Sequence, residues 1–171
     1  MLRLEDYIRT IPDFPQPGVM FRDLTPLLGD ARALRTAIGE LALPFRDANV
    51  EIVAGMEARG FIFGALVAWQ LGAGFVPLRK PGKLPAEVEA VTYELEYGTA
   101  TLEVHRDALG RGRRVLLVDD VLATGGTAVA SVDLVSRLRA DLVGCAFLLE
   151  IAALGGRARL GAQRVHAVLS L

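Results

Sequence analysis

The sequence predicts an α/β fold in which helices flank a mostly parallel sheet. Three continuous apolar runs, at 115–118, 142–149 and 165–169, are typical of strands buried on both faces. A helical pattern separates the first two runs, and alternation of strand and helix is what builds a parallel sheet. With 171 residues the chain suits one domain, 1–171, and is too short for two ordinary domains with a linker.

The first half of the chain contains a second set of sheet elements. Asp30 is expected to cap a helix that ends near Pro44, because apolar residues recur there on one helical face. Residues 51–54 and 75–78 are predicted strands, joined by a helix at about 60–71. Together they make a strand–helix–strand unit of the predicted parallel sheet.

Two segments are expected to lie outside the parallel core. Residues 90–95 and 99–105 alternate in polarity and predict a β-hairpin, which we interpret as an excursion from the sheet. The longest irregular stretches are expected at 11–29 and 79–89, both rich in Pro and Gly. Ligands of such folds bind beyond the carboxyl ends of the strands, so the loops after residues 54, 78 and 118 are the first candidates for chemistry.

Composition excludes several classes of function. Lys and Arg number 19 against 20 Asp and Glu, so the net charge of -1 leaves no broad basic field for nucleic acid. The single cysteine, Cys145, lies in an apolar run and predicts a buried thiol, without a disulfide or metal framework. The uncharged stretch 61–78 is divided by Gly72 and Pro77, so we predict no membrane span. The start lacks a secretory signal pattern, and a cytoplasmic location is expected.

The lysines are unevenly placed. The chain has 17 Arg but only two Lys, and Lys80 and Lys83 both lie in the heptapeptide RKPGKLP. An ammonium group is a compact charge that moves over phosphate oxygens more readily than a planar guanidinium does. The heptapeptide is therefore a candidate anion site, with chance clustering of two lysines as the alternative.

The strongest signal is VLLVDDVLATGGTA at 115–128, which combines a buried strand, two acids, a turn rich in Gly and Thr, and a helix start. Residues 123–127 can direct backbone N–H groups at a phosphate, which the helix dipole also favours. Gly125 and Gly126 permit close approach, and Thr124 and Thr127 add hydroxyl groups. The turn lacks the lysine of a Walker loop. An ordinary turn capped by Thr is the alternative.

Two acids at the end of the predicted strand weaken that alternative. Adjacent carboxylates repel each other, so Asp119 and Asp120 are expected to serve a ligand at a buried strand end. Vicinal ribose hydroxyls are natural donors to such a pair, and Mg²⁺ can lie close by.

The segment VLLVDDVLATGGTA resembles the phosphoribosyl pyrophosphate signature of the type I phosphoribosyltransferases. The resemblance implies the fold of that family, with a small N-terminal hood at about 1–30 and a β-hairpin lid at about 80–105. It assigns the ribose hydroxyls to Asp119 and Asp120. It assigns the 5′-phosphate to Ala123, Thr124, Gly125, Gly126 and Thr127. Mg²⁺ is the implied cofactor, held mainly through the substrate with the two aspartates nearby and no direct protein ligand.

Three further segments resemble the adenine-specific branch of that family. They are FPQPGVMFRDLTPLL at 14–28, AGMEARGFIFG at 54–64, and RKPGKLP with the following YELEYG at 93–98. The implied reaction of purine salvage joins adenine to phosphoribosyl pyrophosphate, giving AMP and pyrophosphate, in a homodimer. The hood is implied to contact adenine through Val19, Met20, Phe21 and Arg22. Phe21 suits stacking on a purine, with a core position under a Pro-rich loop as the alternative.

The resemblance also supplies the pyrophosphate contacts, which are Arg59, Arg79, Lys80 and Lys83. Arg59 follows a predicted strand, so it is expected at the carboxyl edge of the sheet, with a solvated helix start as the alternative. The peptide bond between Glu57 and Ala58 is implied to be cis.

The lid carries the implied proton acceptor. By the resemblance, Glu96 faces the imidazole edge of the purine and helps to remove a proton as N9 attacks, while Tyr97 covers the site. Glu96, Arg59 and Lys83 are thus the predicted catalytic residues. For Glu96 an exposed acid of a hairpin is the alternative.

Two other functions stay open at this point. A regulator that senses phosphoribosyl pyrophosphate without catalysis would need a DNA-binding element, for which a hood motif starting at Phe14 leaves no room. An enzyme for another base, such as a 6-oxopurine, needs a donor aimed at O6, yet no Lys follows Lys83. Arg157 and Arg159 are expected in a helix beyond the site.

Overall fold

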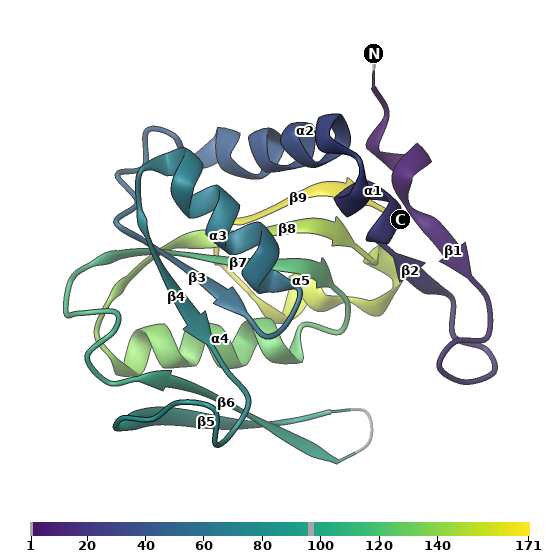
Figure 1. The fold of residues 1–171 in the computed structure, drawn as a ribbon. Coiled ribbons are helices and arrows are strands. Elements are labelled where there is room, and N and C mark those ends of the chain that lie inside the picture. The colour runs from purple at the N-terminus through teal and green to yellow at the C-terminus, as the bar shows by residue number, and fades with distance from the viewer. Residues whose placement is uncertain (1, 96–97) are drawn as a thin grey trace.

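A five-stranded parallel sheet forms the centre of the molecule, as predicted (Figure 1). The computed structural model describes residues 2–95 and 98–171. The strand order is β4–β3–β7–β8–β9. The strands are β3 (Ile52–Met56), β4 (Gly74–Leu78), β7 (Arg114–Leu122), β8 (Asp141–Glu150) and β9 (Val165–Ser170).

Helices cover both faces of this sheet. Helices α2 (Ala31–Ala42) and α3 (Gly60–Leu71) pack on one face and α4 (Gly126–Arg137) packs on the other (Figure 1). The antiparallel hairpin of β5 (Val88–Glu94) and β6 (Thr99–His105) packs against α4, outside the sheet. The excursion predicted for this hairpin is confirmed.

The N-terminal region is more regular than predicted. Strands β1 (Arg9–Ile11) and β2 (Phe21–Asp23) pair antiparallel and are followed by the short helix α1 (Thr25–Gly29). The prediction of an irregular stretch at 11–29 was therefore wrong for its second half, because β2 finds its partner in β1 across an intervening loop. Short 3-10 helices occur at Leu4–Tyr7, Leu43–Phe45 and Ala152–Leu154, and a four-residue helix, α5, at Gly156–Arg159.

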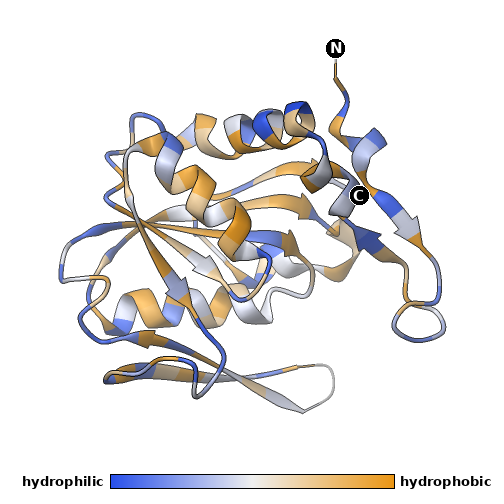
Figure 2. Ribbon diagram, viewed as in Figure 1, coloured by the Kyte–Doolittle hydropathy of each residue, from blue (hydrophilic) through white to orange (hydrophobic). Residues whose placement is uncertain are grey.

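The apolar runs of the sheet lack alternation because both faces of each strand are covered. In β7, Val115 and Leu117 join the core beneath α4, while Leu116 and Val118 join the core beneath α2 and α3. All four side chains are buried. Figure 2 shows the central strands largely in the hydrophobic colours, as expected for strands buried on both sides.

Local signals set the helix boundaries. The Asp30 carboxylate accepts hydrogen bonds from the backbone N–H groups of Arg32 and Ala33, both at 2.9 Å, and α2 begins there as predicted. Helix α3 ends at Gly72, which has a φ of 67°. It buries Phe63 and Val67 against the sheet.

Strand β7 is longer than the predicted run 115–118. Its pairing with β3 ends at Gly55 and Val118, but its pairing with β8 continues to Leu122 and Glu150. The strand does not end before Asp119 and Asp120, because β8 continues to supply backbone partners to β7 beyond Val118. Asp119 and Asp120 therefore stand on a strand and not in the loop after it.

Candidate active site

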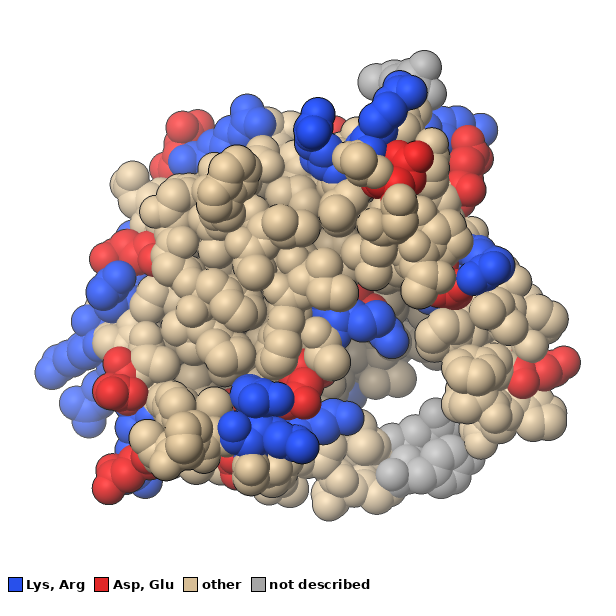
Figure 3. Space-filling model, viewed as in Figure 1, with Lys and Arg blue, Asp and Glu red and all other residues tan. Residues whose placement is uncertain are grey.

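A cavity of about 820 Å³ lies at the carboxyl ends of the sheet strands, beneath the hood. Figure 3 shows the surface hollowed between the hood and the body of the molecule, with Lys and Arg side chains near the hollow. The lining residues are Gly18, Val19, Met20, Phe21, Arg22, Glu57, Ala58, Arg59, Lys80, Asp119, Asp120, Val121, Ala123, Thr127, Ile151 and Leu154. The structure thus brings most of the predicted site residues to one place.

A smaller hollow of about 90 Å³ is formed by the turn before α4. It is lined by Asp119, by residues 121–128 and by Phe147, and it shares several of these residues with the large cavity. Gly125 has a φ of 83°, and α4 begins at the next residue. The N-terminus of a twelve-residue helix, with its free N–H groups and the positive end of its dipole, therefore faces this hollow. This is the geometry of an anion site.

The hairpin contacts this turn directly. The hydroxyl groups of Tyr93 and Thr127 lie 3.1 Å apart. Tyr93 was not among the predicted site residues, because its contact with α4 depends on how the hairpin folds back over the helix. Glu96 and Tyr97 lie outside the described residues.

The two aspartates interact with each other and with Arg59. The buried carboxylate of Asp120 accepts a hydrogen bond from the Arg59 side chain, which is half exposed. The carboxylate of Asp119 accepts a hydrogen bond from the backbone N–H of Asp120 at 2.8 Å. Burial, and then the negative charge of Asp120, raise the pKa of Asp119 well above the ordinary aspartate value.

Glu57 ties the start of the lid to the sheet. Its carboxylate accepts hydrogen bonds from the backbone N–H of Lys80 at 2.8 Å and from Arg79 Nε at 3.3 Å. The Lys80 N–H, followed by Arg79, lowers the pKa of Glu57. The peptide between Glu57 and Ala58 is cis, as the resemblance implied.

The basic segment is split between the cavity and the surface. Lys80 lines the cavity, but the guanidinium of Arg79 lies over the ring of Phe61 at 5.8 Å and donates to the Lys83 carbonyl at 3.4 Å. Arg79 and Lys83 do not line the cavity in this structure. Their predicted contact with pyrophosphate requires the segment to move.

The hood presents the predicted base-binding residues to the cavity. The ring of Phe21 packs edge-on against Phe14, with centroids 5.0 Å apart. The Arg59 guanidinium lies 5.9 Å from the Phe21 centroid on the cavity side. Met20 is exposed, and Arg22 donates a hydrogen bond to the Thr10 hydroxyl of β1.

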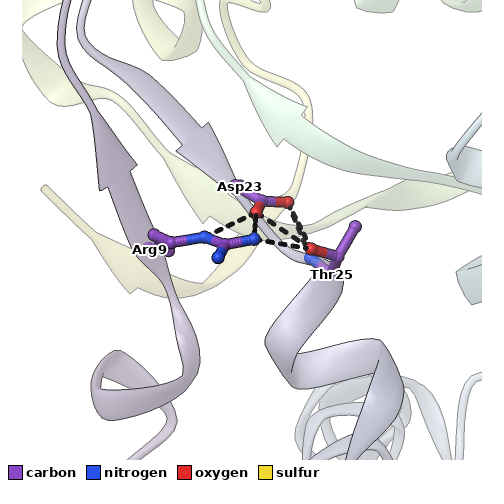
Figure 4. A network of polar contacts seen from close by, with 3 residues as sticks. All are labelled: Arg9, Asp23 and Thr25. Carbon is purple, nitrogen blue, oxygen red and sulfur yellow. Dashed lines mark hydrogen bonds and ion pairs between the residues drawn. The ribbon is translucent and has the colours of Figure 1, made fainter.

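A polar network joins the elements of the hood to one another (Figure 4). Asp23 accepts hydrogen bonds from Arg9 Nε at 3.0 Å, from Arg9 Nη2 at 2.6 Å and from the Thr25 N–H at 2.9 Å. These bonds, led by the Thr25 N–H, lower the pKa of Asp23 to about 2. The Asp23 carboxylate is therefore ionised, and joins β1, β2 and α1, throughout the neutral range.

Sequence reasoning missed part of the site after β8. Ile151 and Leu154 line the cavity, and the rule that ligands bind beyond strand carboxyl ends could have found them. Arg157 and Arg159 lie in a helix, α5, as expected, and neither is among the residues that line the two cavities. Helix α5 folds back, and Arg159 Nη1 donates a hydrogen bond of 3.1 Å to the carbonyl of Thr124 in the turn before α4.

The described part of the chain contains no group of three or more His, Cys, Asp or Glu side chains arranged to hold a metal ion. Asp119 and Asp120 are adjacent carboxylates that line the cavity. In the same described residues, no helix is long and apolar enough to span a membrane.

Known proteins share this fold and sequence. The phosphoribosyl transferase domain family matches residues 28–167. The adenine phosphoribosyltransferase of Methylococcus capsulatus is 62% identical over 169 residues, covering 99% of each chain. The crystal structure of the Rhodothermus marinus adenine phosphoribosyltransferase superposes with a TM-score of 0.94 at 54% identity, over 98% of this chain and 96% of that one.

A third relative was crystallised with a base. The Saccharomyces cerevisiae adenine phosphoribosyltransferase, in complex with adenine and an imino-altritol bisphosphate, superposes with a TM-score of 0.90. The two sequences are 38% identical, and the superposition covers 95% of this chain and 94% of the yeast chain.

The raised pKa of Asp119 predicts how stability changes with pH. The folded state holds this proton more tightly than the unfolded chain, so the contribution is present at acid pH and is lost as pH rises through the folded pKa. We expect Asp119→Asn, which cannot ionise, to gain stability over wild type with rising pH, by about 1.4 kcal/mol per unit of pKa difference. Urea unfolding from pH 3 to 8, a range that begins below the ordinary aspartate pKa, measures this.

A difference for Asp119→Asn that is constant over the same range would contradict the raised pKa.

Proposed function

The chain belongs to the phosphoribosyl transferase family, and we propose that it transfers the 5-phosphoribosyl group of phosphoribosyl pyrophosphate to N9 of adenine, giving AMP and pyrophosphate. The relatives confirm the family and the fold predicted from the sequence. The observation that carries the proposal is the position of the small hollow before α4, which shares lining residues with a larger cavity that is also lined by the hood. A phosphorylated sugar and a flat base fit these two parts.

The proposed phosphate subsite is the turn before α4. Ala123, Thr124, Gly125, Gly126 and Thr127 would hold the 5′-phosphate through backbone N–H groups and hydroxyls, supported by the dipole of α4. Asp119 and Asp120 would accept hydrogen bonds from the two ribose hydroxyls. Both line the cavity next to this turn, which supports that assignment.

The proposed pyrophosphate subsite lies beside the basic residues of the large cavity. Arg59 and Lys80 line it, and Arg79 and Lys83 stand on the adjoining segment that begins the lid. Fixed positive groups stabilise the charge that develops on a leaving group, typically by ~3 to 4 kcal/mol each. Mg²⁺ fits a site with two carboxylates and a phosphorylated ligand, and when bound it would neutralise further charge on the pyrophosphate.

The hood would bind the base. Val19, Met20, Phe21 and Arg22 line the roof of the cavity, where backbone groups can pair with the edge of a purine and Phe21 can stack on its face. A backbone carbonyl accepts a hydrogen bond from the 6-amino group of adenine but not from the keto oxygen of a 6-oxopurine. Ile151 and Leu154 add apolar surface to the same cavity.

The reaction uses both faces of the ribose, one for the leaving group and the other for the attacking base. Pyrophosphate leaves C1 while positive charge builds on the ribose, and N9 attacks from the other face. Glu96 would take a proton from the purine during this attack, and Tyr97 would cover the site. With the hood at about 1–30 and the lid at about 80–105 of one domain, closure would exclude water that otherwise hydrolyses the cation.

Adenine should be strongly preferred over hypoxanthine and guanine. Sites that recognise a base by hydrogen bonds to its edge discriminate by ~10⁴, whereas apolar shape alone gives about 10². We therefore expect kcat/KM to favour adenine over hypoxanthine by at least ~10³ in steady-state assays. Comparable values for the two bases would contradict adenine but leave the transfer chemistry in place. Binding of phosphoribosyl pyrophosphate with no turnover of any base would indicate a regulator.

Glu96→Ala should lower kcat by about 10² to 10⁴ while leaving ground-state affinities largely intact, since a general base contributes in the transition state. Rapid-quench measurement of the chemical step separates this effect from product release. Glu94→Ala, on the same hairpin but at an exposed position of β5, is the matched control. Full activity of Glu96→Ala would exclude a general-base role for Glu96.

We also propose that the chain acts as a homodimer, with the outer face of α3 in the interface. Ile62 and Trp69 lie on this face and are 42% and 83% exposed, an unusual position for apolar side chains on a helix that is apolar all round. Figure 3 shows few charged side chains over the middle of the face that α3 occupies in Figure 1. The cytoplasmic location stays a prediction.

The dimer is tested by sedimentation velocity. Wild type should sediment at twice the chain mass, and Trp69→Glu should shift it toward the single chain because a charge would be buried between copies. Arg35→Glu, an exposed change on α2, is the control. A single-chain mass for wild type, or an unchanged dimer for Trp69→Glu, would exclude this interface.

A further inference from the structure

An ion pair between Arg157 and Glu150 anchors the segment that follows β8. The carboxylate of Glu150, at the last residue of β8, is only 7% exposed and accepts hydrogen bonds from Arg157 Nε at 3.0 Å and Nη2 at 2.6 Å. Arg157 Nη1 also donates to the Val165 carbonyl of β9 at 2.9 Å. The four residues of α5 are therefore held against the ends of two sheet strands.

From this anchor the segment reaches the turn before α4 at two points. A Cβ at Gly156 would lie 2.3 Å from the carbonyl oxygen of Ala123 and 3.0 Å from the backbone nitrogen of Gly125. Only a residue without a side chain allows the two backbones to approach so closely. At the other end of α5, Arg159 Nη1 donates to the Thr124 carbonyl at 3.1 Å.

The two contacts differ in kind: Arg159 makes a hydrogen bond to the Thr124 carbonyl, whereas Gly156 makes a close backbone approach to Ala123 and Gly125. Together they restrict the peptides of a turn whose residues line the small hollow. Affinity for an anion depends on such preorganisation, because a free turn must lose conformational entropy when the ligand binds. Thr124 is itself exposed, so core packing does not fix this part of the turn.

We propose that Gly156 and Arg159 are positioning residues for the phosphate-binding turn 123–127. This inference rests on the proposed function, because it takes that turn to be the 5′-phosphate subsite. Gly156 sets the closest approach of the two backbones, and Arg159 fixes the Thr124 peptide. Neither residue contacts the ligand. The ion pair of Glu150 and Arg157 holds the segment in place. Arg159 is therefore not needed to anchor the segment and can position the turn.

The first experiment is Arg159→Ala. Calorimetric affinities are measured for three ligands: phosphoribosyl pyrophosphate and AMP, which carry a 5′-phosphate, and pyrophosphate, which does not. Loss of one partly exposed hydrogen bond predicts about three- to tenfold weaker binding of the first two ligands. Pyrophosphate affinity should stay unchanged. In steady-state assays KM for phosphoribosyl pyrophosphate should rise by the same factor with kcat little altered, and Arg159→Lys should restore part of the loss.

The second experiment is Gly156→Ala, which forces the turn to move away from the segment. We expect a larger loss of affinity for both 5′-phosphate ligands than in Arg159→Ala. Gly39→Ala is the control for this change, since a Cβ there meets no atom within 4 Å. Arg35→Ala, which removes an exposed guanidinium from α2, is the control for Arg159→Ala. Both controls should bind all three ligands as wild type does.

The outcomes separate this inference from the proposed function. Equal affinities of wild type and Arg159→Ala for phosphoribosyl pyrophosphate and AMP would overturn the positioning role alone. An equal loss for pyrophosphate would also overturn it, because a general weakening of the fold would then explain the result. Failure of wild type to bind either 5′-phosphate ligand would overturn the proposed function and the positioning role with it.

Discussion

The constraint on which the site depends is the placement of two adjacent carboxylates, the half-buried Asp119 and the buried Asp120, within β7. Charges removed from water need partners, and the structure supplies them from distant parts of the chain. Asp120 pairs with Arg59 at the start of α3, while the raised pKa of Asp119 favours its protonated, neutral form. The sheet places these groups beside the N-terminus of α4, so one short region combines acceptors for sugar hydroxyls with donors for a phosphate.

Two of the basic groups at or near the cavity are already paired with acids. Arg59 is bonded to Asp120, and Arg79 is bonded to Glu57 at the root of the lid. A polyanionic ligand would compete with these carboxylates for the same cations, so its net binding energy is smaller than the charges alone suggest. Lys80 has its backbone N–H held by Glu57, whereas its side chain lines the cavity.

Rigid anchors surround a site built mostly from loops. Asp23 joins the elements of the hood to one another, Glu57 attaches the lid to the end of β3, and Glu150 holds the segment after β8. Each of these acids accepts two or more hydrogen bonds. Loops carry the ligand contacts because their backbone N–H groups are free, but they need such attachments to hold one geometry. The buried pairs are thus better understood as positioning devices than as sources of stability.

The sequence by itself determined the features that depend on neighbours along the chain. The apolar runs, the cap at Asp30, the helix at 60–71 and the turn at 123–127 that precedes α4 could all be predicted, because periodicity and turn chemistry are local. The tertiary structure alone decided the length of β7, which β8 prolongs, and the return of Arg159 to that turn. These contacts join residues far apart in sequence, and only the packing of strands and helices brings them within hydrogen-bond distance.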